Sequence, residues 1–251
     1  MMTNKYLFIC GAPRSGTTAL WRLIASDERI IIGVERYGNL FFKAPLTPEL
    51  FTSDRFCNIQ PGDTFYNDLT TFNPYYKNVA GRFSNASYVG DKIPLLYNHL
   101  DRLFEQIPDA KVIILLRNII DIASSYESRA NNIDDLSWRR DKRTASAIHD
   151  WRASINVLKR YIADERVLPL IYEDFFVNDG KLDILYKFLE MEPTEQVINA
   201  YQSMLQGSAN LENNRKRHLP LDSVRLICET APFGLYRQVL EEIKTSQAIA
   251  S

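Results

Sequence analysis

Cysteine and histidine are scarce in this sequence, and neither forms a pattern that binds a metal. The three cysteines, Cys10, Cys57 and Cys228, are too few and too scattered for a disulfide framework or a Cys-x-x-Cys metal pair. The three histidines are also far apart, so none has a second ligand at the spacing of a zinc site. We therefore expect a reducing, cytoplasmic environment and no metal requirement.

Long hydrophobic runs and an excess of one charge are also missing. The apolar run Tyr6–Cys10 is too short for a signal-peptide core, and no later run approaches the ~20 apolar residues that span a bilayer. The formal net charge is −1, so no global field attracts a polyanion such as DNA. We expect no transmembrane segment and no nucleic-acid partner, and any anion site must be local.

Strand and helix patterns alternate along most of the chain. With 251 residues, 45% of them hydrophobic, it can bury one substantial core, and we expect one domain over residues 1–251. The predicted strands are Tyr6–Cys10, Arg29–Gly33, Tyr88–Gly90, Lys111–Leu116 and Arg166–Tyr172, and the predicted helices begin at Thr17, Pro94, Ile119 and about Arg140. This alternation favours an α/β fold, in which a mostly parallel central sheet is flanked by helices on both faces.

Two long segments depart from this alternation. From about residue 36 to 86, prolines and aromatic residues predict an irregular, partly helical insertion on the substrate side. Its aromatic residues suit either a pocket for a ring, a sugar or a lipid, or the packing of a small lobe. They include Tyr37, Phe41, Phe42, Phe65, Tyr66, Phe72, Tyr75 and Tyr76. From about residue 178 to 251 we expect a helical part, broken at Gly207–Leu219 and at Pro232.

A phosphate site is predicted where the first strand meets the first helix. The segment Gly11–Thr18 reads Gly-Ala-Pro-Arg-Ser-Gly-Thr-Thr, and in this context backbone N–H groups and the helix dipole converge on an anion. Thr17 stands where the nucleoside-triphosphate pattern G-x-x-x-x-G-K-[ST] has the lysine that reaches the outer phosphates. A single phosphate with sulfate attached does not need that lysine. The residues expected to bind it are Arg14, Ser15, Gly16, Thr17 and Thr18.

Two segments of the chain resemble one family. Pro-Arg-Ser-Gly-Thr-Thr after a strand is similar to the 5′-phosphosulfate loop of sulfotransferases that use 3′-phosphoadenosine-5′-phosphosulfate (PAPS). The segment Arg117–Tyr126 resembles the family's 3′-phosphate segment, and Arg117 and Ser125 are the matching positions. An Arg at the carboxyl end of a strand faces the crevice in which α/β sheets bind ligands. The resemblance implies a P-loop NTPase-like sulfotransferase fold, with PAPS as donor co-substrate and no metal required.

The resemblance also implies catalytic roles. Glu35 resembles the general base of the tyrosylprotein and bacterial branches, and would take the proton of the acceptor hydroxyl. Lys92, in Asp-Lys-Ile-Pro, resembles a lysine that would neutralise, with Arg14, the charge on the leaving phosphosulfate bridge. The residues alone leave other interpretations open: Glu35 could be a surface carboxylate paired with Arg36, and Lys92 a solvated lysine at a helix start.

Other parts of the sequence match the family less well. The loop lysine and histidine base of cytosolic steroid and phenol sulfotransferases have no counterpart, so the chain is closer to the branch with Arg and Glu. The candidate for the late basic segment that closes over the nucleotide is Asn213–Arg217, with Arg215 and Lys216 as binding residues. A solvated basic loop fits that segment equally well. Tyr172–Asp174 resembles a stretch of the family to which we assign structural support.

The sequence therefore predicts an enzyme that moves a sulfuryl group from PAPS to an acceptor hydroxyl by in-line displacement. The acceptor is a small molecule, carbohydrate, lipid or peptide, and a homodimer is compatible with the sequence. One alternative is a P-loop kinase or NTPase, for which Asp121 is an available Mg²⁺ ligand. The other is a catalytically silent nucleotide-binding protein.

Overall fold

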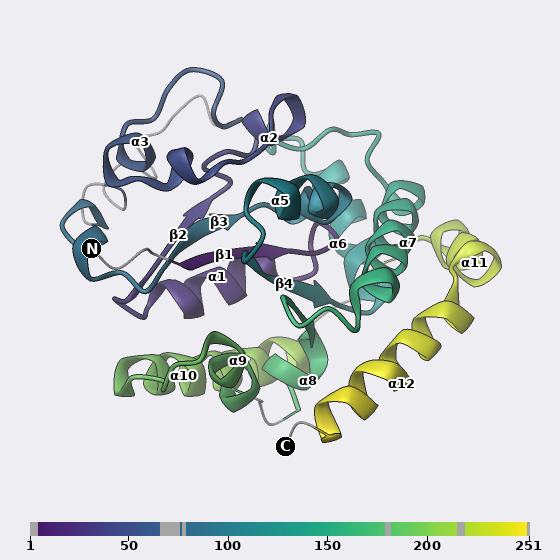
Figure 1. Cartoon of the computed structure of the whole chain (residues 1–251). Helices are drawn as coiled ribbons and strands as arrows, with labels where there is room; N and C mark the ends of the chain where they lie inside the picture. The colour runs from purple at the N-terminus through teal and green to yellow at the C-terminus, as the bar shows by residue number, and fades with distance from the viewer. Residues whose placement is uncertain (1–4, 66–75, 77–78, 179–181, 215–218, 250–251) are drawn as a thin grey trace.

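The centre of the molecule is a five-stranded sheet in which every strand pair is parallel. The computed structural model describes residues 5–65, 76, 79–178, 182–214 and 219–249. The strands are β1 (Lys5–Cys10), β2 (Ile30–Val34), β3 (Tyr88–Lys92), β4 (Lys111–Leu116) and β5 (Val167–Ile171). Their order in the sheet is β2-β3-β1-β4-β5 (Figure 1). The predicted α/β class and mostly parallel sheet are confirmed.

The register brings the carboxyl ends of the strands to one edge. Val34 at the end of β2 pairs with Lys92 at the end of β3, and Leu116 at the end of β4 pairs with Ile171 at the end of β5. Strands β1 and β3 approach so closely that a Cβ on Gly90 would lie 1.7 Å from the Leu7 carbonyl oxygen. Glycine is therefore required there.

Alternate residues of each strand pack into two hydrophobic layers, one on each face of the sheet, as expected when both faces are covered. On one face Leu7 and Ile9 pack with helices α1 (Thr17–Ala25), α8 (Tyr172–Phe176), α9 (Leu182–Leu189) and α10 (Glu195–Asn214). On the other, Phe8 and Cys10 pack with a layer that includes α5 (Leu100–Gln106), α6 (Ile119–Asn131) and α7 (Thr144–Tyr161). Helices α11 (Leu221–Thr230) and α12 (Phe233–Ile249) pack outside α7 (Figure 1).

Several boundaries differ from the sequence prediction. The third strand extends to Lys92 because β3 is paired on both sides. The helix expected from Pro94 starts as a 3₁₀ helix, Pro94–His99, before α5. The break expected over Gly207–Leu219 begins later than predicted, since α10 continues to Asn214 and α11 starts at Leu221. A Cβ at Gly207 would meet nothing within 4 Å, so this glycine costs only the usual ~1 kcal/mol of helix propensity.

The segment after β2 is irregular and partly helical. It contains α2 (Leu40–Lys43), α3 (Ser53–Cys57) and the 3₁₀ turns Pro48–Phe51 and Phe83–Asn85. The fully buried guanidinium of Arg36 anchors it, donating to Asp63 Oδ2 at 2.5 Å and to the carbonyls of Arg55, Phe56 and Asn58. Among the aromatic residues, Tyr37, Phe41 and Tyr76 are buried, whereas Phe42 and Phe65 are exposed. Tyr66, Phe72 and Tyr75 lie outside the described residues.

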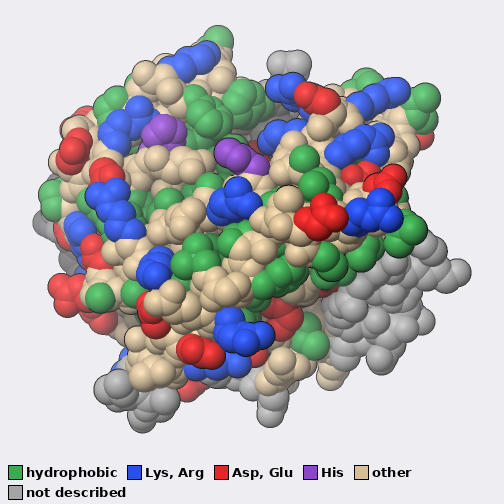
Figure 2. All heavy atoms as spheres, turned by 90° about the vertical axis from the view of Figure 1, so that its right-hand side faces the viewer, with side chains coloured by type: hydrophobic (Ala, Val, Ile, Leu, Met, Phe, Trp, Pro, Cys, Tyr) green, Lys and Arg blue, Asp and Glu red, His purple; other side chains and the backbone are tan. Residues whose placement is uncertain are grey.

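Charges of both signs are distributed over the surface. On the face that carries α7, α11 and α12, basic and acidic side chains are interspersed (Figure 2), as expected for a net charge of −1. None of the described helices is both long enough and apolar enough to cross a bilayer.

Candidate active site

One cavity of about 750 Å³ lies at the carboxyl edge of the sheet, and residues at or just beyond the end of every strand line it. Adjacent strands of a sheet are about 4.8 Å apart, so the order of the strands fixes the order of these side chains. In that order they are Glu35, Lys92, Arg14, Arg117 and Tyr172. The phosphate loop after β1 is therefore at the centre, with Glu35 and Lys92 on one side and Arg117 and Tyr172 on the other.

The phosphate loop is a tight turn whose conformation depends on glycine. The Ser15 N–H donates to the Ala12 carbonyl at 3.0 Å, and Gly16 caps α1 with φ +105°. A Cβ at Gly16 would lie 2.5 Å from the Tyr172 ring, so a larger residue is excluded both by space and by backbone conformation. The first turn of α1 carries no acidic residue, which leaves its positive dipole end available to an anion.

Not all of the loop residues predicted to bind the nucleotide reach the cavity. Arg14, Gly16, Thr17 and Thr18 line it. Ser15 is fully buried and is not part of the lining. Its hydroxyl lies 2.9 Å from where a Cβ of Gly11 would stand, so the turn points this side chain back beneath the loop.

A direct hydrogen bond joins the two phosphate motifs. Arg14 Nε donates to Ser125 Oγ at 2.8 Å, across a sequence separation of 111 residues. Burial, followed by the positive charges of Arg129 and Arg117, lowers the pKa of the Arg14 guanidinium. Cations that crowd together in this way are stabilised by a multivalent anion, because guanidinium groups form strong charge-assisted hydrogen bonds to phosphate.

Arg117 is held in a fixed orientation at the end of β4. Its guanidinium stacks on Tyr172, 3.9 Å from the ring centroid, and Nη2 donates to Asp121 Oδ2 at 3.1 Å. The Trp151 indole N–H donates to the Arg117 carbonyl at 2.9 Å. Arg117 is only 7% exposed, so its side chain is preorganised rather than free in solvent, as an oriented phosphate ligand should be.

The Tyr-Glu-Asp stretch supports this arrangement. Glu173 Oε1 accepts hydrogen bonds from the Asn118 backbone N–H at 3.0 Å and from its side-chain amide at 2.5 Å. Asn118 in turn caps α6, because its Oδ1 accepts the Asp121 N–H at 2.8 Å. Tyr172 and Glu173 thus fix the strand end and the helix start that position Arg117.

Among the described residues, the buried polar side-chain atoms without a partner lie in segments that form the carboxyl edge of the sheet, and one of them, in Arg117, belongs to the cavity lining. In the part of the chain that the structure describes, the buried side-chain atoms without a hydrogen-bond partner are Ser15 Oγ, Arg117 Nε and Glu173 Oε2. Ser15 belongs to the phosphate loop, Arg117 follows β4 and Glu173 lies in α8, directly after β5. Buried polar groups in native proteins are nearly always paired, and the free Nε of Arg117 fits a phosphate oxygen.

Glu35 and Lys92 form an ion pair at the other end of the cavity. Lys92 Nζ donates to Glu35 Oε1 at 2.7 Å, and the two side chains are 2% and 25% exposed. Arg36 is buried and bonded to Asp63, so the interpretation of Glu35 as its surface partner is wrong. The interpretation of Lys92 as a solvated lysine is also wrong, because it ends a buried strand.

Asp91 holds the turn that carries Glu35. This fully buried carboxylate accepts the backbone N–H groups of Arg36 at 3.1 Å and Tyr37 at 2.8 Å. Burial raises the pKa of Asp91 to about 7, although the two N–H donors act in the opposite direction. Glu35 itself has φ +51°, a conformation that costs a non-glycine residue about 1–3 kcal/mol unless its surroundings impose it. Asp91 was not singled out by the sequence.

Further lining residues come from a segment that sequence reasoning missed. Leu136, Ser137, Trp138, Arg139 and Lys142 follow α6 and line the cavity together with Arg129. The Arg129 guanidinium lies 4.7 Å from the centroid of the Trp138 ring, and Lys142 Nζ lies 5.6 Å from it. The sequence signal that could have identified this segment as part of a site is a tryptophan among basic residues. Arg215 and Lys216, by contrast, lie outside the described residues.

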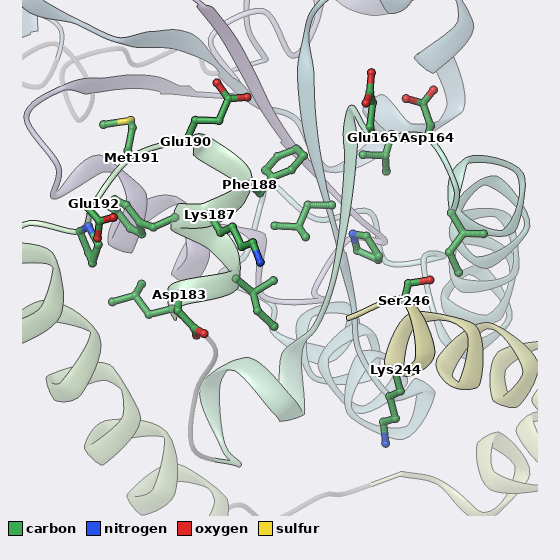
Figure 3. Close-up of a pocket in the computed structure, with 18 of the residues that line it drawn as sticks. Asp164, Glu165, Asp183, Lys187, Phe188, Glu190, Met191, Glu192, Lys244 and Ser246 are labelled. Carbon is green, nitrogen blue, oxygen red and sulfur yellow. The ribbon is translucent and has the colours of Figure 1, made fainter. Parts of the chain in front are cut away.

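A second hollow, of about 1420 Å³, lies elsewhere in the molecule. It is lined by β5, α9 and the end of α12, and Lys187, Phe188 and Glu190 are among its residues (Figure 3). Glu190 bonds to Lys5 and Lys111, which begin β1 and β4. The hollow therefore lies at the amino edge of the sheet, opposite the edge at which parallel α/β sheets bind ligands.

Comparisons with known proteins agree with the fold. The sulfotransferase domain from the curacin biosynthetic pathway is 14% identical and superposes with a TM-score of 0.55, covering 91% of this chain and 98% of its own. Sulfotransferase STF9 from Mycobacterium avium is 16% identical, with a TM-score of 0.52 and coverage of 98% and 77%. No curated protein sequence matches the chain. The family model described as the sulfotransferase family matches residues 7–196, and the chain therefore belongs to the sulfotransferase family.

Proposed function

We propose that this sulfotransferase uses PAPS as the donor and transfers its sulfuryl group to an acceptor hydroxyl. The observation that carries the proposal is the order of side chains along the carboxyl edge of the sheet. A phosphate loop at the centre is flanked by an oriented arginine on one side and by a lysine–glutamate pair on the other. A donor with two separate phosphate groups and one reactive end fits that order.

The residues that would hold the donor are those of the two phosphate motifs. The loop from Arg14 to Thr18 would hold the 5′-phosphate, through backbone N–H groups, the helix dipole and the Arg14 guanidinium. Arg117 and Ser125 would hold the 3′-phosphate, and the unpaired Nε of Arg117 gives that group a hydrogen-bond donor. PAPS, when bound, supplies an activated sulfuryl group. Arg215 and Lys216 stay candidates for closing this side of the site.

Glu35 and Lys92 would carry the chemistry at the reacting end. Glu35 takes the proton of the acceptor hydroxyl as its oxygen bonds to sulfur, a role worth on the order of 10²–10⁴ in rate. Lys92 and Arg14 stabilise the negative charge left on the phosphate oxygen as its bond to sulfur breaks. The Lys92–Glu35 hydrogen bond at 2.7 Å orients the carboxylate before the reaction.

Neither alternative function has a specific observation in its favour. A kinase would need a replacement for the phosphate-loop lysine and an Asp available to Mg²⁺. Asp121 is buried and accepts hydrogen bonds from Arg117 and Asn118. A catalytically silent protein would not need Glu35 in a left-handed conformation beside a buried lysine. The cytoplasmic location and the homodimer stay predictions from the sequence.

A ligand-stabilisation experiment tests the donor assignment. We expect adenosine 3′,5′-bisphosphate to raise the melting temperature without added metal, and to do so more than ATP with Mg²⁺. Arg117→Ala should abolish most of that increase, while Arg160→Ala, which removes an exposed arginine from α7, should leave it unchanged. Stabilisation by ATP with Mg²⁺ alone would contradict the proposal and favour a kinase.

A further inference from the structure

Large exposed hydrophobic side chains surround the mouth of the cavity. Phe42, Phe65 and Leu136 are 46%, 58% and 93% exposed, and all of them line it. Apolar surface left in water costs about 25 cal/mol per Å², and clustered exposure of this kind marks a ligand site more often than scattered surface residues do. Two segments contribute, α2 with the chain beyond it and the segment between α6 and α7, which pass close to each other in Figure 1.

The aromatic wall, consisting of Phe41, Phe42 and Phe65, is a fixed surface. The Phe41 and Phe42 ring centroids are 4.0 Å apart, and Phe65 lies 5.9 Å from Phe42. His99 supports the buried side of Phe41 at 5.5 Å. Asp63 fixes the backbone beneath, because its carbonyl accepts the N–H groups that open α2 at 3.0 and 3.1 Å. The wall begins six residues after Glu35 and shares the cavity with it.

Carboxamide and aspartate side chains, which can each both orient and pair sugar hydroxyls, are missing from the described part of this lining. Among the described residues, the cavity is lined by no Asn, Gln or Asp side chain, and Glu35 is its acidic member. A site that binds a polyol must pair most of its hydroxyls, since each unpaired one costs binding free energy. At the mouth, Ser137, Arg139 and Lys142 remain to pair hydroxyls, so the aromatic side of the lining favours an apolar ring over a polyol, and a sugar probe tests this.

Two cations of the cavity lining, Arg129 at the end of α6 and Arg139 beyond it, have carboxylate partners. Arg129 pairs with Asp135 at 2.5 Å and Arg139 with Asp141 at 2.5 Å. An acidic peptide would have to compete with these carboxylates for both arginines. Lys142 also lines the mouth, so an acidic acceptor keeps a cation to pair with, and an acidic peptide is the probe that competes with the apolar surface.

We infer that the acceptor is a neutral phenol or alcohol with an apolar, ring-sized body. The body stacks against the aromatic wall and under Leu136, and the hydroxyl points to Glu35. Aromatic pairs favour offset or edge-on contacts with centroids 4.5–7 Å apart, and the spacing of Phe42 and Phe65 provides two such partners. The inference rests on the proposed sulfuryl transfer and adds the chemical class of its substrate.

An acceptor panel with ³⁵S-labelled PAPS tests this inference. The probes are 2-naphthol, N-acetylglucosamine and an acidic tyrosine-containing peptide. We expect label on 2-naphthol, and an increase of about tenfold in its KM in Phe42→Ala and in Phe65→Ala. The affinity for adenosine 3′,5′-bisphosphate should not change in either variant, because neither ring belongs to the phosphate motifs.

The matched control comes from the segment between α6 and α7. Leu136→Ala should raise the KM for 2-naphthol, whereas Ile133→Ala should not, because Ile133 is 68% exposed but does not line the cavity. Label on the sugar or the peptide but not on 2-naphthol would overturn the inference and leave the proposed function intact. Failure of the proposed function is seen separately, as no stabilisation by adenosine 3′,5′-bisphosphate and no label on any probe.

Discussion

Replacing Lys92 by Met should separate catalysis from stability. Lys92 is 2% exposed and its ammonium has Glu35 as ion-pair partner at 2.7 Å. Buried ion pairs gain little over a hydrophobic residue of similar volume, because desolvation offsets the Coulomb attraction. Met removes the buried charge, and the Glu35 side chain, which is 25% exposed, can be hydrated. We therefore expect the free energy of unfolding to change by no more than about 1 kcal/mol.

The activity of the same variant should fall steeply. If Lys92 stabilises the charge of the leaving group, its loss should lower the single-turnover rate by on the order of 10²–10³, as removal of one preorganised donor does in other enzymes. The reverse change, Glu35→Ala, leaves the buried ammonium without its partner and should cost about 3–5 kcal/mol of stability. Lys92→Met should thus be stable and inactive, and Glu35→Ala unstable.

Urea unfolding and transfer of ³⁵S label from saturating PAPS measure the two effects. Lys111→Met is the matched control, since Lys111 also pairs with a glutamate at 2.7 Å, but at the opposite edge of the sheet. It should keep full activity. If Lys92→Met loses several kcal/mol of stability and activity together, or keeps its turnover, the catalytic role assigned to Lys92 is refuted.

Three further changes test the rest of the site. Glu35→Gln should lower kcat on the order of 10²–10⁴, with the affinity for adenosine 3′,5′-bisphosphate unchanged by calorimetry; unchanged turnover would favour a silent protein. Arg117→Lys should weaken that affinity at least about tenfold, because lysine can neither stack on Tyr172 nor bind phosphate bidentately. Because burial raises the pKa of Asp91 from 3.8 to about 7, its stabilising contribution should be present at pH 4 and lost towards pH 8, by at most roughly 4 kcal/mol. Asp91→Asn should remove that pH dependence from urea unfolding curves, and should lower kcat by releasing the turn of Glu35; a wild-type pH dependence in the variant would contradict it.

The strands and the phosphate loop could be predicted because their signals are local. A continuous apolar run such as Lys111–Leu116 is typical of a strand buried on both faces. The loop Gly11–Thr18 can be recognised because glycine, hydroxyl-bearing residues and arginine occur within a stretch of eight residues. Local signals are less reliable for helix ends. The break was expected to begin at Gly207, but α10 continues through this exposed glycine to Asn214, because the turns on either side maintain the helix.

The partners of the site residues could not be predicted, because they are distant in sequence. From the sequence, Glu35 could be an ion-pair partner of the adjacent Arg36. In the structure the turn orients the two side chains apart, so that Arg36 bonds to Asp63 in the insertion and Glu35 bonds to Lys92. Asp91 has no motif of its own. Its role could be inferred only from the structure, in which its carboxylate accepts hydrogen bonds from two backbone N–H groups.

What the sequence determined by itself is the set of chemical groups and the strand ends that carry them, since both follow from short-range pattern. The tertiary structure alone decided their order along the sheet, the bond from Arg14 to Ser125 and the exposure of Phe42 and Phe65. Such features depend on which strands become neighbours and on which faces stay uncovered, and these are set by the packing of the whole chain.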